Sequence, residues 1–229
     1  MASALCTYIK STIGRKTIMG ITGLILSGFV FGHMAGNMLI FAGPEFFNSY
    51  GHAIVSNKPL LYGSEAVLLL AVFLHMAFGI WLTKDNKAAA GAASDNRYAV
   101  SASKDKESPL SSRTMIYTGV VIAVFIVLHL LHFKYGEYYT IVHDGVEMRD
   151  LHRLVVELFH EPVYVAWYVG ALVLLCMHLR HGFEACWQSL GFRHPVYSEY
   201  IYKISWAYAL VVSLGFISQP LYVYFFYKG

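Results

Sequence analysis

Histidine is the residue type whose placement in this chain first indicates chemistry. Four histidines stand inside long apolar segments, one in each segment: His33, His75, His129 and His178. An ionisable side chain in a hydrocarbon layer is costly unless it has a partner, so such residues are functional by default. Imidazole nitrogens bind transition metals, and two imidazoles on facing helices can bind a haem iron from both sides. The four histidines therefore predict two haem sites with two ligands each.

The composition indicates that these histidines lie in a membrane protein. The chain has 229 residues, of which 57% are hydrophobic and 14% charged, and its mean hydropathy is +0.51. A soluble domain carries about a quarter charged residues. The small net charge of +3 and the scattered basic residues do not indicate nucleic-acid binding. Cys6, Cys176 and Cys186 form no CxxC pair, and we expect them to be small apolar groups rather than ligands or a disulfide set.

Five apolar segments meet the requirement of about 20 residues for crossing a bilayer. They lie at about 17–42, 60–84, 112–135, 162–187 and 200–226. The first is too long for the apolar core of a signal peptide, which has about 7–15 residues, so we interpret it as a retained first span. The sequence therefore predicts an all-α membrane protein with five transmembrane helices and a single domain, 1–229. The first four helices would form a haem-binding four-helix bundle, with the fifth outside it.

The basic residues predict the orientation in the membrane. Twelve Lys and Arg residues lie in or beside the N-terminal segment and the second and fourth connections, against five on the opposite side. This excess places the N-terminus in the cytoplasm and the C-terminus outside. We expect a short surface helix within 1–16, a solvated loop at 85–112 and a short amphipathic helix at about 148–159.

The depth of each histidine predicts the pairing. His33 and His129 lie beyond the middle of their spans towards the outside, whereas His75 and His178 lie beyond the middle of spans that run inward. At 1.5 Å rise per residue the two layers are roughly 10–13 Å apart. The outer pair is then His33 with His129, and the inner pair is His75 with His178. His132 and His181 are competing ligands, three residues further on. Zinc is disfavoured because no carboxylate or thiolate joins either layer.

Glycines on the spans predict close approach to their backbones. Gly28, Gly32 and Gly36 form one small-residue face of the first span, which a helix or a flat ring could approach. Glycine also follows three of the four histidines by one helical turn, at Gly36, Gly79 and Gly182. A porphyrin lying against a helix would need such space.

Several stretches resemble a known family. The most specific runs through Ser11, Arg15-Lys16, Met19-Gly20 and Thr22-Gly23 into Gly32-His33-Met34 and Gly36-Asn37; the patches His129-Leu-Leu-His132 and His178-Leu-x-His181 add to it. With these residues the chain resembles the dihaem cytochrome b membrane anchor of succinate:quinone oxidoreductases, that is, succinate dehydrogenase and fumarate reductase of the five-helix, single-anchor type. The resemblance covers nearly the whole chain.

The resemblance implies the following function. A flavoprotein subunit with FAD and an iron–sulfur subunit would dock on the cytoplasmic face of a bacterial inner membrane and interconvert succinate and fumarate. The multi-pass chain would carry two haem b groups and pass electrons between the iron–sulfur clusters and a quinone, which in such members is usually menaquinone. It would thus serve the respiratory chain and the tricarboxylic acid cycle as the membrane subunit of the enzyme, with no dicarboxylate chemistry of its own. A homo-oligomer of the complex remains open.

Two further sets of site residues follow from this resemblance. Haem propionates need cations or hydrogen-bond donors, and the candidates are Arg15, Lys16, His132, Arg153, Arg180 and His181. A quinone site near the outer haem needs groups that exchange protons or hydrogen bonds, and the first connection supplies Glu45, Asn48 and His52. Some dihaem fumarate reductases carry a glutamate two residues before the fourth ligand for proton movement. Cys176 occupies that position here, which argues against that proton route.

Two alternatives remain from the sequence. One is a dihaem cytochrome b of another respiratory complex, such as a hydrogenase or formate dehydrogenase. The bc-type arrangement does not fit, because it places two ligands on each of two helices. The other is a haem-free proton-coupled transporter with intramembrane histidines, although the chain lacks the inverted repeat and broken helices expected of one.

Overall fold

A computed structural model describes residues 4–94, 110–192 and 194–228. Within these residues, five helices are long and apolar enough to cross a membrane: Thr12–Ala42, Lys58–Ala88, Thr114–Lys134, Pro162–Ser189 and Pro195–Phe226. Each coincides with one expected segment. The expected helical membrane protein with five spans is therefore confirmed at this level.

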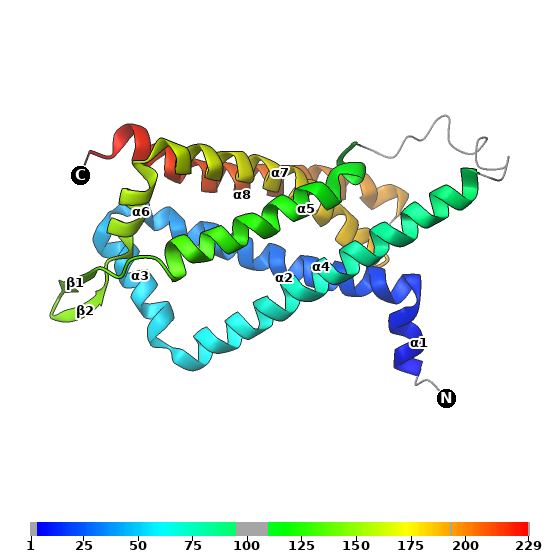
Figure 1. Cartoon of the computed structure of the whole chain (residues 1–229), viewed down its shortest axis with the longest axis horizontal. Helices are drawn as coiled ribbons and strands as arrows, with labels where there is room; N and C mark the ends of the chain where they lie inside the picture. The colour runs from blue at the N-terminus through cyan, green and yellow to red at the C-terminus, as the bar shows by residue number, and fades with distance from the viewer. Residues whose placement is uncertain (1–3, 95–109, 193, 229) are drawn as a thin grey trace.

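The order of elements is simple (Figure 1). The helices and strands are α1 (Ala4–Lys10), α2 (Thr12–Asn37), the 3-10 turn η1 (Met38–Ala42), α3 (Pro44–Ser56), α4 (Lys58–Ser94), α5 (Leu110–His129), the π-helical turn η3 (Leu130–Lys134), β1 (Thr140–His143), β2 (Val146–Arg149), α6 (Leu151–Phe159), α7 (Pro162–Ser189) and α8 (Pro195–Phe226). The two termini lie at opposite ends of the long axis, with α1 at one end and α3, α6 and the two strands at the other.

Local sequence signals set several helix boundaries. The hydroxyl of Ser11 accepts a hydrogen bond from the backbone N–H of Gly14 at the start of α2. Pro162 and Pro195 open α7 and α8, where a missing N–H costs nothing. Gly43 separates η1 from α3 with a φ of 105°, a conformation that favours glycine.

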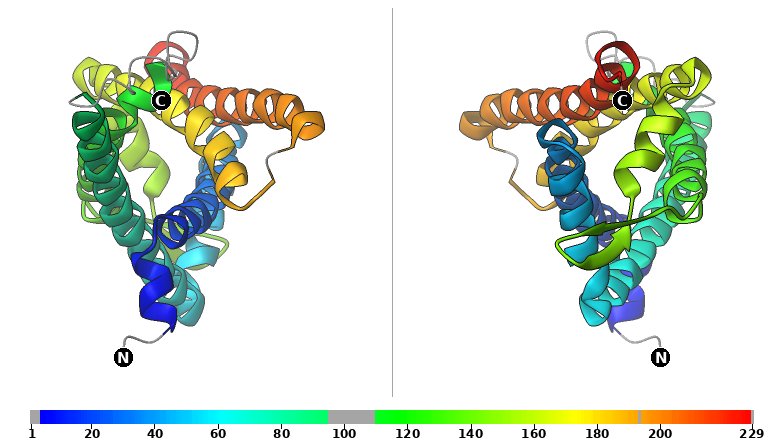
Figure 2. Two further views of the ribbon diagram at one scale, coloured as in Figure 1. Left: turned by 90° about the vertical axis from the view of Figure 1, so that its right-hand side faces the viewer. Right: turned by 90° about the vertical axis from the view of Figure 1, so that its left-hand side faces the viewer.

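The spanning helices pack in a definite order. Helix α2 packs against α4 and α7, and α5 packs against α7 and more sparsely against α4. The helices that carry His33 and His129 are therefore diagonally placed, and so are those that carry His75 and His178. End-on views show α8 across the molecule from α4 (Figure 2).

Helix α8 is fastened to α7 and α2. The Tyr208 hydroxyl donates a hydrogen bond to the backbone carbonyl of Ser27 over 2.6 Å, and its ring stacks on Phe183. Ala209 and Val212 are fully buried against α7. Because lipid is as apolar as these side chains, such helices associate through close packing and hydrogen bonds rather than through exclusion of water.

The α3–α6 cap, formed by η1, α3, β1, β2 and α6, closes one end of the spans. Its apolar core comes from η1, α3, α6 and the adjoining ends of α7 and α8: Ile40, Phe47, Val155, Phe159, Val165, Tyr168 and Val223. Asn48 is 2% exposed and joins α3 to α6. Its amide donates to Asp150 Oδ1 and its carbonyl oxygen accepts from the backbone N–H of His152, each over 2.8 Å.

Two expectations about the connections need correction. The amphipathic helix at 148–159 is confirmed for Leu151–Phe159, but Met148 and Arg149 belong to a β-hairpin that was not expected. The Asp144-Gly145 dipeptide turns the hairpin with φ of 50° and 77°, which is the type I′ geometry of tight hairpins. An Asp-Gly pair between alternating apolar residues was the available signal.

The expected loop at 85–112 is wrong at both of its ends. Helix α4 continues to Ser94 and α5 begins at Leu110, while 95–109 lie outside the described residues. Alanine is the strongest helix former, and Ala88–Ala90 with Ala92-Ala93 extend α4 beyond its apolar part. The first connection is helical, because α3 occupies most of it. The short surface helix at the N-terminus is present as α1.

Replacing Asn48 by Ala is expected to destabilise the cap. The change leaves the backbone N–H of His152 without its partner and Asp150 Oδ1 with only its bond from the N–H of Arg153 among the described residues, which costs about 1–3 kcal/mol. The thermal unfolding temperature in detergent should fall by several degrees. Glu45→Gln, whose carboxylate is exposed on the same helix, is the matched control, and equal unfolding temperatures for the two variants would contradict this role of Asn48.

Acidification is expected to loosen the cap through His152. This side chain is 4% exposed, lies against Phe47 and Tyr227, and its Nε2 has no hydrogen-bond partner among the described residues. Burial lowers the pKa of His152 below 6.5, while Asp150 opposes the shift. The unfolded chain therefore binds the extra proton first, and the stability contribution present above about pH 6.5 is lost as the pH falls towards the folded pKa.

The measurement compares the wild type with His152→Phe, which keeps the ring contacts and cannot titrate. Between pH 7.5 and 5, the unfolding temperature of the wild type should fall more steeply than that of the variant. Parallel curves would show that His152 does not contribute.

Candidate functional site

The structure brings the four histidines of the spans together in two couples. The ring centroids of His33 on α2 and His129 on α5 are 5.7 Å apart, with an interplanar angle of 85°. Those of His75 on α4 and His178 on α7 are 6.3 Å apart, with an angle of 66°. These are the couples that the depth of each residue predicts.

The spacing within each couple matches that of two imidazoles on one metal. Two metal–nitrogen bonds of about 2 Å, added to the distance from each bonding nitrogen to its ring centre, give roughly 6 Å between centroids. Among the described residues, no group of three or more His, Cys, Asp or Glu side chains could hold a bare metal ion. Each couple thus offers two ligands and leaves the remaining coordination positions to another donor.

A threonine hydroxyl lies against one nitrogen of each ring in the His75–His178 couple. Thr22 Oγ1 of α2 lies 3.3 Å from Nδ1 of His75, and Thr118 Oγ1 of α5 lies 3.1 Å from Nδ1 of His178. Each hydroxyl donates its own hydrogen to the preceding turn of its helix, to Ile18 or Met19 and to Met115 or Thr114. A hydroxyl has one hydrogen, so a threonine that donates it to the helix carbonyl accepts from the ring, in which case Nδ1 carries the proton. The lone pair of Nε2 is then free to bind a metal.

Glycines beside these threonines leave room for the imidazoles. A Cβ on Gly119 would lie 3.5 Å from Cε1 of His178, and one on Gly23 would lie 3.4 Å from Cε1 of His75. The Gly23 position is the tighter one, because the same Cβ would meet the Cys186 sulfur at 2.7 Å. Any side chain at Gly23 would therefore press on Cys186.

The two supporting helices share a sequence pattern that the sequence reasoning missed. The pattern occurs at 22–33 and again at 118–129. It consists of Thr-Gly, then Phe after five intervening residues, then His after three more. Phe29 and Phe125 stack on the histidines that follow them, with centroids 5.4 Å and 5.7 Å apart. Eleven residues separate threonine from histidine, which returns the chain to the same helix face after about 16 Å. This rise is somewhat larger than the expected spacing of 10–13 Å.

The His33–His129 couple has different surroundings. The amide nitrogen of Asn37 lies 3.4 Å from Nε2 of His33, and the ring of Phe216 from α8 packs 5.7 Å away. Nδ1 of His129 is buried without a hydrogen-bond partner among the described residues. No hydroxyl corresponding to Thr22 or Thr118 contacts either ring in the described part of the chain.

The competing histidines lie apart from these couples. Nδ1 of His132 is 3.0 Å from the Tyr168 hydroxyl, and its ring packs against Tyr164 at 5.0 Å. The π-helical turn η3 follows His129 directly and carries His132 towards α7. His181 lies one turn beyond His178 and is half-buried.

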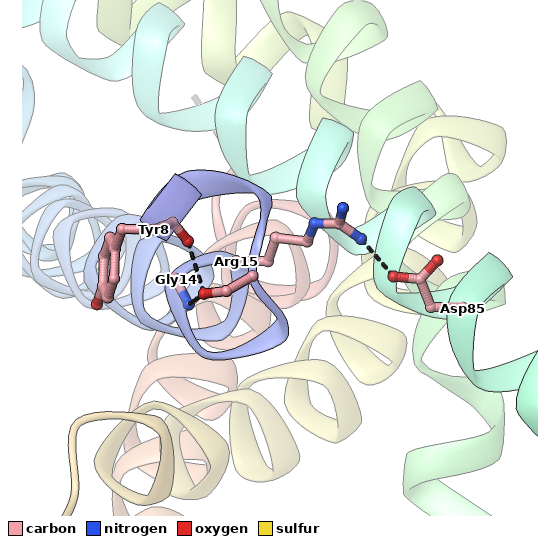
Figure 3. A network of polar contacts seen from close by, with 5 residues as sticks. Tyr8, Gly14, Arg15 and Asp85 are labelled. Carbon is pink, nitrogen blue, oxygen red and sulfur yellow. Dashed lines mark hydrogen bonds and ion pairs between the residues drawn. The ribbon is translucent and has the colours of Figure 1, made fainter. Parts of the chain in front are cut away.

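The basic candidates occupy varied environments. Arg15 extends from α2 to an ion pair with Asp85 on α4 (Figure 3), and its guanidinium lies 3.7 Å above the ring of Trp81. Arg180 pairs with Glu184 and lies over aromatic rings of α8. Lys16 is exposed. Arg153 is exposed, pairs with Glu157 over 2.8 Å and covers the ring of Tyr139.

The quinone candidates all lie on α3. Glu45 is exposed and lies 3.9 Å from His143 of the hairpin. Asn48 is buried in its bonds to α6, a position that indicates a structural role. His52 is half-buried one turn after Asn48.

The three glycines on one face of the first span have different surroundings. A Cβ on Gly28 or Gly32 would meet nothing within 4 Å, so no helix of the described chain packs there. A Cβ on Gly36 would collide with the ring of Tyr50 from α3, at 2.5 Å. Gly79 and Gly182 face methionine side chains at 3.5 and 3.7 Å.

No family model matches the sequence, and no curated protein or solved structure matches it either.

Proposed function

We propose that the chain is a dihaem cytochrome b that anchors a succinate:menaquinone oxidoreductase in a bacterial inner membrane. The observation that carries the proposal is the facing of four imidazoles in two couples, with centroids 5.7 and 6.3 Å apart, among apolar helices. His33 with His129 and His75 with His178 would each hold one haem b iron.

The residues present fit this group. A haem supplies four ligands in a plane, so a site for it needs only the two imidazoles that each couple offers. Helix α2 leaves open space next to His33, because a Cβ on Gly28 or Gly32 would meet nothing within 4 Å. Bound haem would supply a reversible one-electron carrier inside the membrane.

The contribution of the chain itself is to hold, orient and shield. Four helices fix the imidazoles at two levels, Phe29 and Phe125 limit the rotation of two of them, and the threonines set the proton on the other two. Cations at the ends of the spans suit propionates, and Arg15, Lys16, Arg180 and His181 lie towards the end with α1, which we place in the cytoplasm. His132, whose ring contacts Tyr168 as that of His129 does, is the candidate at the level of the His33–His129 couple.

The partners follow from the resemblance to succinate:quinone oxidoreductase anchors. A flavoprotein with FAD and an iron–sulfur protein would dock at the cytoplasmic end. The chain would pass electrons between the iron–sulfur clusters and menaquinone. Its first four spanning helices would form the haem-binding bundle, in the packing order α2, α4, α5 and α7.

Purified protein is expected to contain two low-spin haems per chain, and His75→Ala is expected to remove one of them. Loss of one imidazole leaves a haem held from a single side, while the His33–His129 couple is untouched. Pyridine haemochrome analysis and the reduced-minus-oxidised spectrum measure this. His160→Ala, an exposed histidine whose ring contacts the carbonyl of Tyr227, should keep both haems. Colourless wild-type protein would refute the proposal, and two haems in His75→Ala would refute the pairing.

Glu45→Gln and His52→Ala are expected to lower turnover with a menaquinol analogue at least severalfold while both haems are retained. Each change removes a group able to exchange a proton at the membrane edge. The measurement is quinol oxidation by the assembled complex with fumarate. Glu147→Gln, an exposed carboxylate on β2, is the control. Wild-type turnover in both variants would exclude α3 as the quinone site.

A further inference from the structure

We propose that Thr22-Gly23 and Thr118-Gly119 are two copies of an imidazole cradle that holds His75 and His178 in the Nδ1–H form and thereby sets the reduction potential of the haem between them. The inference rests on the proposed haem function and assigns positioning residues to one of its two sites. The threonines are not ligands, because they contact the ring nitrogens that face away from the metal position.

Geometry supports the first part of this assignment. Both threonines are nearly inaccessible, at 5% and 6% exposure. Both place Oγ1 within 3.3 Å of an imidazole Nδ1, and both also lie within hydrogen-bonding distance of a helix carbonyl that can take the hydroxyl hydrogen. With the hydrogen donated to that carbonyl, the oxygen accepts from the ring and stabilises the tautomer with Nε2 free.

The arrangement is repeated between different pairs of helices. Helix α2 supports a histidine of α4, and α5 supports a histidine of α7. In each case the glycine after the threonine lies against Cε1 of the same ring. In both helices the Thr-Gly dipeptide also stands eleven positions before a histidine of the other couple, His33 or His129. A chance contact would not be expected to recur with the same dipeptide at the same sequence separation.

The expected consequence is electronic. An imidazole that donates its second N–H to an acceptor becomes a stronger donor to its metal. A stronger donor stabilises the oxidised iron, so it lowers the reduction potential. The His33–His129 couple lacks such acceptors among the described residues, and the effect is therefore confined to one of the two haems.

The test uses Thr22→Val and Thr118→Val, which keep the side-chain volume and remove the hydroxyl. In the assembled complex, redox titration followed optically and by electron paramagnetic resonance should show the His75–His178 haem shifted to higher potential. We expect about a tenfold change in its reduction equilibrium per variant, which corresponds to about 59 mV for one electron. The other haem should keep its potential and its resonance signal.

Two sets of controls separate hydrogen bonding from packing. Thr22→Ser and Thr118→Ser keep the hydroxyl and should retain the wild-type potential. Thr83→Val removes a hydroxyl on α4 that bonds only the preceding turn, at the Gly79 carbonyl, and it should change neither haem. A shift in Thr83→Val equal to that in Thr22→Val would overturn the assignment.

Every outcome bears on the proposal. Loss of this haem in both valine variants, with retention in both serine variants, supports the cradle, because only the hydroxyl differs. Loss in all four variants, or unchanged potentials in both valine variants, overturns it. If the wild type contains two haems and the potentials of both valine variants are unchanged, the cradle is refuted and the proposed function is not. Wild-type protein without haem would refute the proposed function itself.

Discussion

The cost of leaving an imidazole nitrogen unpartnered among apolar helices constrains this structure more than any other interaction. Each ring has two nitrogens, and lipid and aliphatic side chains can satisfy neither. In this structure the rings face one another in couples, and a threonine hydroxyl lies beside Nδ1 of His75 and of His178. The packing order of α2, α4, α5 and α7 follows, because each couple joins two helices that are diagonal rather than adjacent.

The ends of the spans solve a different problem from their middles. Within the membrane layer little apolar area is buried between helices, and α5 is scarcely covered by the rest of the chain. Beyond it, the α3–α6 cap builds a compact core and uses Asn48 to join two short helices. Ion pairs from Lys134 to Glu65 and from Arg15 to Asp85 hold α4 near its two ends. Charge at these ends, where water and lipid headgroups permit it, thereby supplements the packing of α4 against α2.

Much of the fold could be predicted from composition and run length, and the errors have identifiable physical causes. The five spans were predictable because a bilayer sets a minimum apolar length. The continuation of α4 to Ser94 was missed because charge was weighed above the helix preference of its alanines. The hairpin at 140–149 was missed because Asp144-Gly145 was not recognised as a tight turn. The bonds of Asn48 to Asp150 and His152 could not be predicted, since nothing local in the sequence indicates partners a hundred residues away.

For the candidate site, the sequence alone determined which imidazoles exist, at what depth, and hence which can meet. The depth of each histidine follows from the fixed rise of a helix and the fixed thickness of a bilayer, because both can be counted along one span without knowing its neighbours. Only the tertiary structure decided which ring nitrogen of His75 and of His178 has a hydroxyl beside it. Tautomers depend on hydrogen bonds between helices, so Thr22 matters only because α2 rotates it towards His75, and Thr118 only because α5 rotates it towards His178. The repeated Thr-Gly pattern was visible in the sequence, but its partners could be identified only once the helices were placed side by side.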